Sequence, residues 1–316
     1  MKALVISGGG SKGAFGGGVA QYLIEEQGRD YDLLIGTSTG SLLVPFLAVK
    51  KLDRLKEAYT NVTQDDIFYI NPFKIKKDEM GSTKIGINYL NVLWNVSFRG
   101  KNAFGDASNL RKLINKFMTE RDYEIIRESG KEVLVCTTNL TLAQTEFKST
   151  NEYGWKDYGD WMLASSSVPP FMEYITKGGY DYADGGILEH APIQEAINRG
   201  ATEVDVIILR KEHDILSPER IRNPFHYILR SIDIMMTEIG RDDVRLANLK
   251  AKQNNVKLNF YYTPRKLTNN SLIFNKEAMT EWWEEGYQSA MNNYCKTYEL
   301  VDKRKPKLIR NGMVKN

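Results

Sequence analysis

The 316-residue sequence contains few of the residues and segments that mark cross-linked, metal-binding or membrane-spanning proteins. Its two cysteines, Cys136 and Cys295, lie far apart in no metal-like spacing, which excludes a disulfide framework and predicts two reduced, buried thiols. The longest apolar stretch, residues 42–49, is far too short to cross a bilayer, and the N-terminal apolar run is too short for a signal peptide. We therefore expect a cytoplasmic protein.

The sequence also has little net charge and few histidines. The formal net charge is +3, and no basic stripe interleaved with aromatic residues indicates a nucleic-acid partner. Of the three histidines, His213 and His226 stand in no motif, and we interpret them as surface or core residues. The remaining histidine, His190, is therefore the imidazole with the best claim to a chemical role.

What the sequence does contain is an alternation of short apolar runs and helical patterns. Residues 2–7 and 31–36 predict buried strands, and residues 14–28 and 39–62 predict helices, the second bent or delayed by Pro45. This order predicts βαβ units in an α/β fold with a mostly parallel sheet. Later patterns predict strands at 131–140, 144–150 and 256–264, and helices at 109–128, 225–253 and 275–301. With no internal repeat or clear linker, residues 1–300 are interpreted as one domain.

Two segments depart from the alternation. Residues 64–106 mix aromatics, glycine, asparagine and lysine with weak periodicity, which indicates an irregular excursion with short helices. That excursion is either a cap or lid, or an ordinary packed insertion. Residues 301–316 form a basic tail, with six basic residues after Asp302, which either contacts anionic lipid or is frayed in solvent.

A candidate nucleophile stands between the second predicted strand and its helix. The segment Gly36-Thr37-Ser38-Thr39-Gly40 fits the pattern G-x-S-x-G. On a sharp strand-to-helix turn, such a serine exposes its hydroxyl at the carboxyl edge of the sheet, and small flanking residues permit the turn. The helix that follows offers unpaired amides and the positive end of its dipole.

A serine nucleophile needs a base, and the sequence offers two arrangements. In the first, Asp184 orients His190, but one tight turn would then have to present both groups. In the second, Asp184 takes the serine proton directly, since Gly185 and Gly186 allow a sharp turn and close approach to a neighbouring loop. Asp181 is a second candidate for the base, but no glycine turn follows it. Residues 184–186 could also be an ordinary Asp-Gly-Gly turn with no catalytic role.

The glycine-rich loop at residues 8–13, GGGSKG, has two readings. It fits the G-x-G-x-x-G fingerprint of dinucleotide-binding oxidoreductases, but the acids that would hold a ribose, Asp30 and Asp32, stand at the start of the second strand. The alternative is an oxyanion hole, in which consecutive glycines aim several amides at one spot beside a helix N-terminus. This reading uses the loop, Ser38 and Asp184 together.

The segments GGGSKG, GTSTG and DGG, in that order, resemble the three signatures of the patatin-like phospholipase family. The similarity extends to ASSSVPPFM (164–172), DGGILEHAP (184–192) and WWEEGYQSA (282–290), and it is most specific over residues 4–48 and 164–200. It thus covers most of the chain. His190 departs from the pattern, because many members carry asparagine there.

The resemblance implies a three-layer α/β/α fold and hydrolysis of acyl esters in phospholipids or other lipids, without metal or cofactor. It implies Ser38 as the nucleophile, Asp184 as its base, and an oxyanion hole built from Gly8, Gly9, Gly10 and Thr39. The supporting motif residues are Lys12, Gly13, Gly36, Gly40, Gly185 and Gly186. Some bacterial members are lipases switched on by a ligand or by assembly, so a regulated effector remains an alternative.

A lipid substrate would give a role to two further features of the sequence, the basic tail and the aromatic residues of the excursion. A lipase on bilayers makes transient contact with the membrane surface, and the basic tail is a candidate for that contact, although such tails are more often frayed in solvent. Five aromatic residues of the excursion are candidates to line an acyl-chain site, although such residues more often belong to the core: Phe68, Tyr69, Phe73, Trp94 and Phe98.

Overall fold

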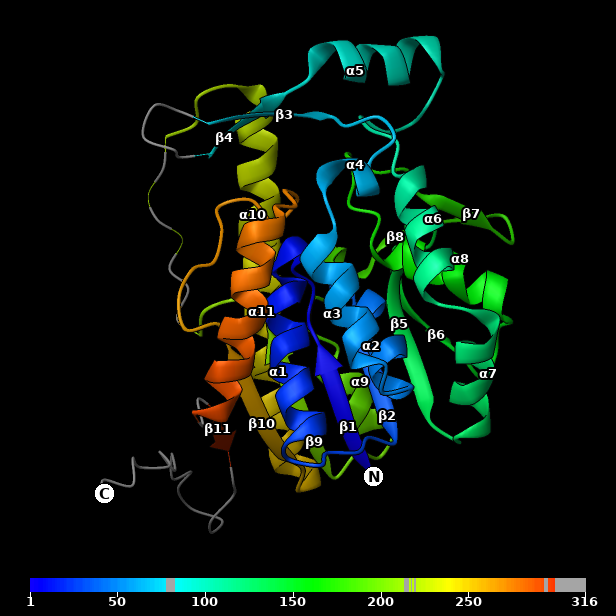
Figure 1. Cartoon of the computed structure of the whole chain (residues 1–316), viewed down its shortest axis with the longest axis vertical. Coiled ribbons are helices and arrows are strands. Elements are labelled where there is room, and N and C mark those ends of the chain that lie inside the picture. Colours follow the sequence, from blue (N-terminus) through cyan, green and yellow to red (C-terminus); the bar gives the residue numbers. More distant parts are fainter. Residues whose placement is uncertain (78–82, 213–215, 217, 219, 293–294, 299–316) are drawn as a thin grey trace.

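The computed structural model describes residues 1–77, 83–212, 216, 218, 220–292 and 295–298 (Figure 1). Within this part of the chain a nine-stranded sheet has the order β11-β10-β9-β1-β2-β5-β8-β7, and β6 pairs with β5. Its strands are β1 (Lys2–Ile6), β2 (Leu33–Thr37), β5 (Glu132–Asn139), β6 (Gln144–Ser149), β7 (Ile175–Lys177), β8 (Tyr180–Asp184), β9 (Glu203–Ile208), β10 (Lys257–Tyr262) and β11 (Cys295–Tyr298).

The middle of the sheet is parallel and its margins are antiparallel. Strands β10, β9, β1, β2 and β5 run in one direction, whereas β6, β8 and β11 oppose their neighbours. Parallel strands are buried on both faces, which explains the continuous apolar runs of β1 and β2. The predicted mostly parallel sheet is confirmed.

Helices cover both faces of the sheet. They are α1 (Gly13–Glu25), α2 (Thr39–Ala48), α3 (Leu52–Asn61), α4 (Gln64–Ile67), α6 (Ser108–Phe117), α7 (Glu120–Glu128), α8 (Trp155–Ser165), α9 (Ile193–Asn198), α10 (Pro224–Asn254) and α11 (Lys276–Met291). Because side chains alternate along a strand, Leu4 and Ile6 pack into one core with α1, α2 and α11, while Ala3 and Val5 pack into a second with α9 and α10. This is the predicted three-layer α/β/α arrangement.

Several element boundaries differ from the sequence prediction. The helix predicted over 39–62 is two helices, α2 and α3, separated at Lys50, whose φ is 55°, and Pro45 lies inside α2 rather than at its start. The helix predicted over 109–128 is also two, because Thr119 forms a capping box with Asp122 that starts α7. The helix predicted to 301 ends at Met291, and Cys295–Tyr298 instead pair antiparallel with β10.

The excursion at 64–106 contains more regular structure than predicted. After α4 come an antiparallel hairpin, β3 (Phe73–Lys77) and β4 (Thr83–Ile87), then α5 (Tyr89–Leu93) and a π-helical turn, η2 (Trp94–Phe98). In Figure 1, α5 stands at the top of the molecule beyond this hairpin. The basic tail predicted at 301–316 lies outside the described residues. Among the helices of the described part, none combines the length and apolar character that a membrane span requires.

Candidate active site

Ser38 occupies a sharp turn between β2 and α2. Its φ is 54° and its ψ is −122°, a backbone conformation that costs a non-glycine residue on the order of 1–3 kcal/mol. Gly36 and Gly40 make the turn possible: a Cβ on Gly36 would lie 2.2 Å from the Gly40 carbonyl carbon, and one on Gly40 would lie 2.2 Å from the Ile6 oxygen. The G-x-S-x-G spacing therefore reflects close backbone contact on both sides of the serine.

Asp184 reaches the same corner because two strands meet end to end along one edge of β5. At the end of β2, Thr37 pairs with Cys136, and at the end of β8, Asp184 pairs with the next residue, Thr137. Strand β6 occupies the opposite edge of β5 over the same stretch, so β2 and β8 share an edge. Residues separated by 146 positions in the chain thus become neighbours.

Asp184 is buried beside Ser38, with 1% of the residue exposed. Its Oδ1 accepts a hydrogen bond from the Gly186 amide at 2.7 Å, while Oδ2 makes no hydrogen bond of good geometry with a described residue. Burial raises the Asp184 pKa to about 7, and interactions with the Ser38 hydroxyl and the Gly186 amide oppose the rise. The arrangement is a carboxylate of near-neutral pKa with one oxygen available beside a serine hydroxyl.

The glycine loop lies on the other side of Ser38. A Cβ on Gly13 would lie 2.3 Å from Thr39 Oγ1, so this glycine allows the start of α1 to approach the serine turn. The Gly8 amide is engaged, because it donates to the His190 carbonyl at 3.0 Å. Gly9, Gly10 and Thr39 line the cavity above Ser38, and the described residues provide no acceptor for their amides.

His190 is in the same corner but is not arranged as a triad member. Its ring is buried against Gly8, where a Cβ would lie 2.7 Å from His190 Cε1, and it makes no hydrogen bond to Asp184. Burial, reinforced by the charges of Arg210 and Lys12, holds the His190 pKa well below 6.5, so the ring is neutral. The alternative arrangement, in which Asp184 orients His190 as the base of Ser38, is therefore not formed in this structure.

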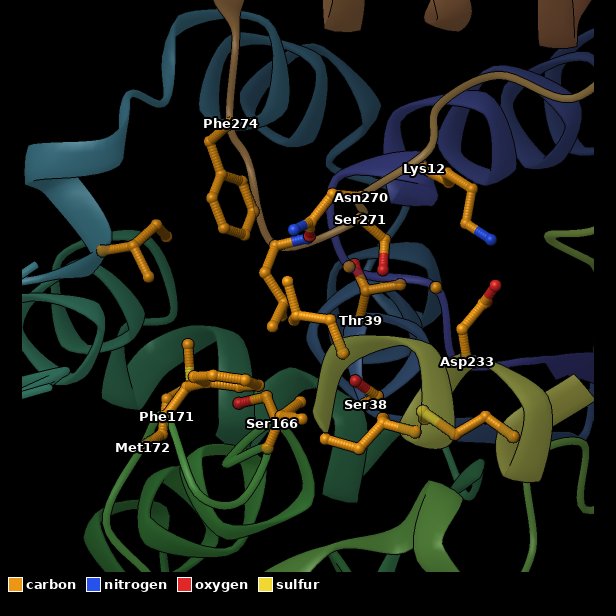
Figure 2. A pocket seen from close by; sticks show the side chains of 18 of the residues that line it. Lys12, Ser38, Thr39, Ser166, Phe171, Met172, Asp233, Asn270, Ser271 and Phe274 are labelled. Atoms are coloured by element: carbon orange, nitrogen blue, oxygen red, sulfur yellow. The ribbon is translucent and has the colours of Figure 1, made fainter. Parts of the chain in front are cut away.

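A cavity of about 700 Å³ opens over Ser38. Figure 2 shows Ser38 between an apolar end, with Phe171, Met172 and Phe274, and a polar end, with Lys12 and Asp233. Further apolar lining residues are Leu42, Phe46, Leu113, Phe117 and Met162, and further polar ones are Arg210, Lys266 and Asn269. An amphipathic cavity of this kind is suited to a ligand with an apolar chain and a polar group.

Of the five aromatic residues considered for an acyl site, Phe68 and Phe73 are buried, and Phe73 packs on the cavity-lining Phe171 with ring centroids 5.1 Å apart. Tyr69, Trp94 and Phe98 are exposed instead. None of the five lines the cavity directly.

Sequence reasoning did not single out Ser165, the last residue of α8. Its hydroxyl accepts a hydrogen bond from the Ser38 amide at 3.1 Å and donates one to the Cys136 carbonyl at 2.6 Å. Ser165 thereby ties the serine turn to β5. The only signal for this role was its place in the ASSSVPPFM segment, because the contacts join three remote parts of the chain.

The described residues give little support to two other kinds of site, one for a metal ion and one for a dinucleotide. Within the described residues, no group of three or more histidine, cysteine, aspartate or glutamate side chains is arranged to hold a metal ion. Asp30 and Asp32, considered for a ribose, precede β2 and lie at the opposite end of that strand from the glycine loop, where Asp32 accepts the Lys2 amide at 2.7 Å.

Comparison with known proteins places this geometry in a family. Residues 4–197 match the model of the patatin-like phospholipase family. The chain is 24% identical over 206 residues to the uncharacterized protein YjjU of Escherichia coli K12, covering 65% of this chain and 51% of YjjU, so it spans about half the length of that relative. The crystal structure of VipD from Legionella pneumophila shares the fold, with a TM-score of 0.52, 17% identity, and coverage of 94% of this chain and 68% of VipD. The family match extends over more than half of the sequence, and the chain therefore belongs to the patatin-like phospholipases.

Proposed function

We propose that the protein is a lipid acyl hydrolase that uses Ser38 and Asp184 as a catalytic dyad. The observation that carries this proposal is the meeting of β2 and β8 on one edge of β5, beneath an amphipathic cavity. It joins a strand-end serine that lines the cavity to a buried carboxylate with an available oxygen. Family membership supports the reaction class.

In the first half-reaction, Ser38 Oγ attacks the ester carbonyl carbon while Asp184 Oδ2 accepts the hydroxyl proton. The carbonyl electrons move to its oxygen, which the amides of Gly9, Gly10 and Thr39 stabilise as an oxyanion. When the carbonyl re-forms, the ester C–O bond breaks and the departing alkoxide takes the proton from Asp184. An acyl group then remains on Ser38.

In the second half-reaction, a water molecule attacks the acyl carbon as Asp184 accepts one of its protons. Collapse of this intermediate breaks the bond to Ser38 Oγ, which recovers its proton from Asp184, and the carboxylic acid is released. A base that must gain and lose a proton twice per turnover works best with a pKa near the working pH. The Asp184 pKa of about 7, raised by burial, meets that requirement.

The shape of the cavity supports a substrate with a long acyl chain. We place the chain at the apolar end, near Phe171 and Phe274, and the head group at the polar end, near Lys12, Arg210 and Lys266. These three cationic side chains outnumber Asp233, the one carboxylate that the described residues place at that end, and the excess of positive charge favours an anionic head group such as a phosphate ester over a neutral one. The substrate would be reached through transient contact with a membrane surface.

The test is to incubate the purified protein with a mixed phospholipid extract and to measure the released fatty acids and lysolipids. Wild type should release both, and Ser38→Ala should reduce release by at least about 1000-fold with unchanged folding. Equal release by the two proteins would refute the proposal. Absence of release from every lipid offered, together with hydrolysis of a short soluble ester, would retain the dyad and remove the phospholipid assignment.

A further inference from the structure

The short helix formed by α5 and η2, residues 89–98, exposes large apolar side chains. We call it the cap helix. Leu90 is 79% exposed, Phe98 70% and Tyr89 68%, and α5 has no buried residue. Trp94, which is 55% exposed, stacks on Phe98 with ring centroids 5.4 Å apart.

The polarity of the cap helix is inverted relative to a surface helix, which normally buries its apolar face. Its buried residue is Asn95, whose Nδ2 donates to the Ala103 carbonyl at 2.9 Å and whose Oδ1 accepts from Arg99 at 2.9 Å. Asn91 likewise donates to the Asn71 carbonyl at 2.9 Å. Polar residues thus fasten the helix to the protein and leave its apolar residues directed outward.

The cap helix stands at the end of the molecule that holds the cavity, which is lined by residues directly after β1 and β2. In Figure 1 it lies beyond the carboxyl ends of β1 and β2, with the β3–β4 hairpin between it and the rest of the fold. That hairpin reaches the cavity, because Ile85 of β4 lines it and Phe73 of β3 packs against the lining residue Phe171. A surface that contacted the cap helix would therefore lie close to the cavity.

Charge distinguishes a lipid surface from other occupants. The cap helix carries no charged residue, whereas the whole excursion, residues 64–106, contains six basic residues and five acidic ones. Lys74 is exposed on β3, and Arg99, directly after the cap helix, lies over the Tyr69 ring at 5.7 Å. Tryptophan and tyrosine favour the boundary between head groups and acyl chains, and basic residues beside them favour anionic lipid.

We propose that the cap helix is the membrane-docking surface of this protein, seated at the head-group boundary of an anionic bilayer. Leu90, Trp94 and Phe98 enter the bilayer, while the exposed Lys74 of the adjoining β3 contacts lipid phosphates. This inference rests on the proposed function for its purpose, which is to hold the cavity against its substrate, but the docking itself requires no catalysis.

The test is co-sedimentation with phosphatidylcholine vesicles, with and without phosphatidylserine, using proteins that carry Ser38→Ala so that the lipid is not consumed. Replacing Leu90, Trp94 and Phe98 together with serine should weaken binding to the anionic vesicles by at least about tenfold. The matched control replaces Leu246 and Leu249 with serine. These two leucines on α10 are 49% and 58% exposed, and the control should bind unchanged.

Two further measurements separate the possible outcomes. With Ser38 intact, the triple serine variant should hydrolyse a short monomeric ester like wild type, and it should lose activity only on vesicles. Unchanged vesicle binding, or loss of a dimer without loss of binding, would overturn the proposal, the second result indicating another copy of this chain as the occupant. Vesicle binding by a wild type that hydrolyses no ester would preserve docking and refute the proposed function.

Discussion

The corner that holds Ser38 and Asp184 lies at the same end of the molecule as the cap helix, but the two are built in opposite ways. In the corner, Ser38 and Asp184 are 5% and 1% exposed, and neighbouring backbones approach so closely that Gly36 and Gly40 have no room for a Cβ. In the cap helix, apolar side chains face outward and a buried asparagine provides the attachment. Close contacts between neighbouring backbones fix the structure of the corner, whereas the cap helix is distinguished by the apolar side chains that it exposes.

This difference predicts which property of the protein a substitution in each region will change. A change in the corner alters either the reacting groups or a backbone that cannot move, so it should affect turnover or folding. A change on the cap helix removes little packing, since surface substitutions usually alter stability by no more than about 0.5 kcal/mol. Its effects should appear mainly when the protein meets lipid.

The largest expected effect is that of Asp184→Asn. An amide cannot accept the Ser38 proton, so turnover of a soluble ester should fall by about 1000-fold or more. The matched control is Asp181→Asn, three residues earlier on the same strand, whose carboxylate accepts a hydrogen bond from Thr176 Oγ1 at 2.7 Å. Steady-state kinetics of both variants decide the matter: equal activity in the two would remove Asp184 from the reaction.

The next effect concerns folding, and it compares a glycine of the corner with one of the β3–β4 hairpin that precedes the cap helix. Gly40→Ala should lower the free energy of unfolding by about 3 kcal/mol or more, because its Cβ would collide with the Ile6 carbonyl oxygen. Gly86→Ala in β4 should be neutral or slightly stabilising, because no described residue lies within 4 Å of its added Cβ. Denaturant unfolding measures both, and a tolerated Gly40→Ala would contradict the packed description of the corner.

The smallest effect in the corner is expected at His190. Because its ring is neutral and not hydrogen-bonded to Asp184, His190→Asn should retain activity within about tenfold. Some loss of stability is expected, since the ring fills space beside Gly8 and Gly240. A collapse of kcat in a variant that remains folded by circular dichroism would instead support a triad.

The sequence was most informative at positions where the backbone is so crowded that only glycine fits. Glycines at fixed offsets predicted the serine turn and the Asp184 turn, because only these residues permit the contacts seen at Gly36, Gly40 and Gly185. The engagement of the Gly8 amide was not foreseeable, since its acceptor is the carbonyl of His190, 182 residues away. The dyad and its oxyanion donors remain predictions until activity is measured.

Elsewhere the local pattern was insufficient. Strand β11 was predicted as helix because helical spacing continues past Met291, and only pairing with β10 makes it a strand. The β3–β4 hairpin was missed because its lysine-rich strands lack the apolar character of buried ones. The cap helix has apolar residues without a core to face, so periodicity alone could not assign their direction.

The most direct test of the central claim is the rate at which a fluorophosphonate labels Ser38 as a function of pH, with the adduct mapped by peptide mass spectrometry. Burial raises the Asp184 pKa to about 7, so the carboxylate is protonated and inactive below that value and becomes a base above it. The labelling rate of wild type should therefore rise with pH to a plateau, with its midpoint near pH 7, whereas Asp184→Asn should label slowly and without that midpoint. A label on another residue, or the same pH profile in both proteins, would contradict the account.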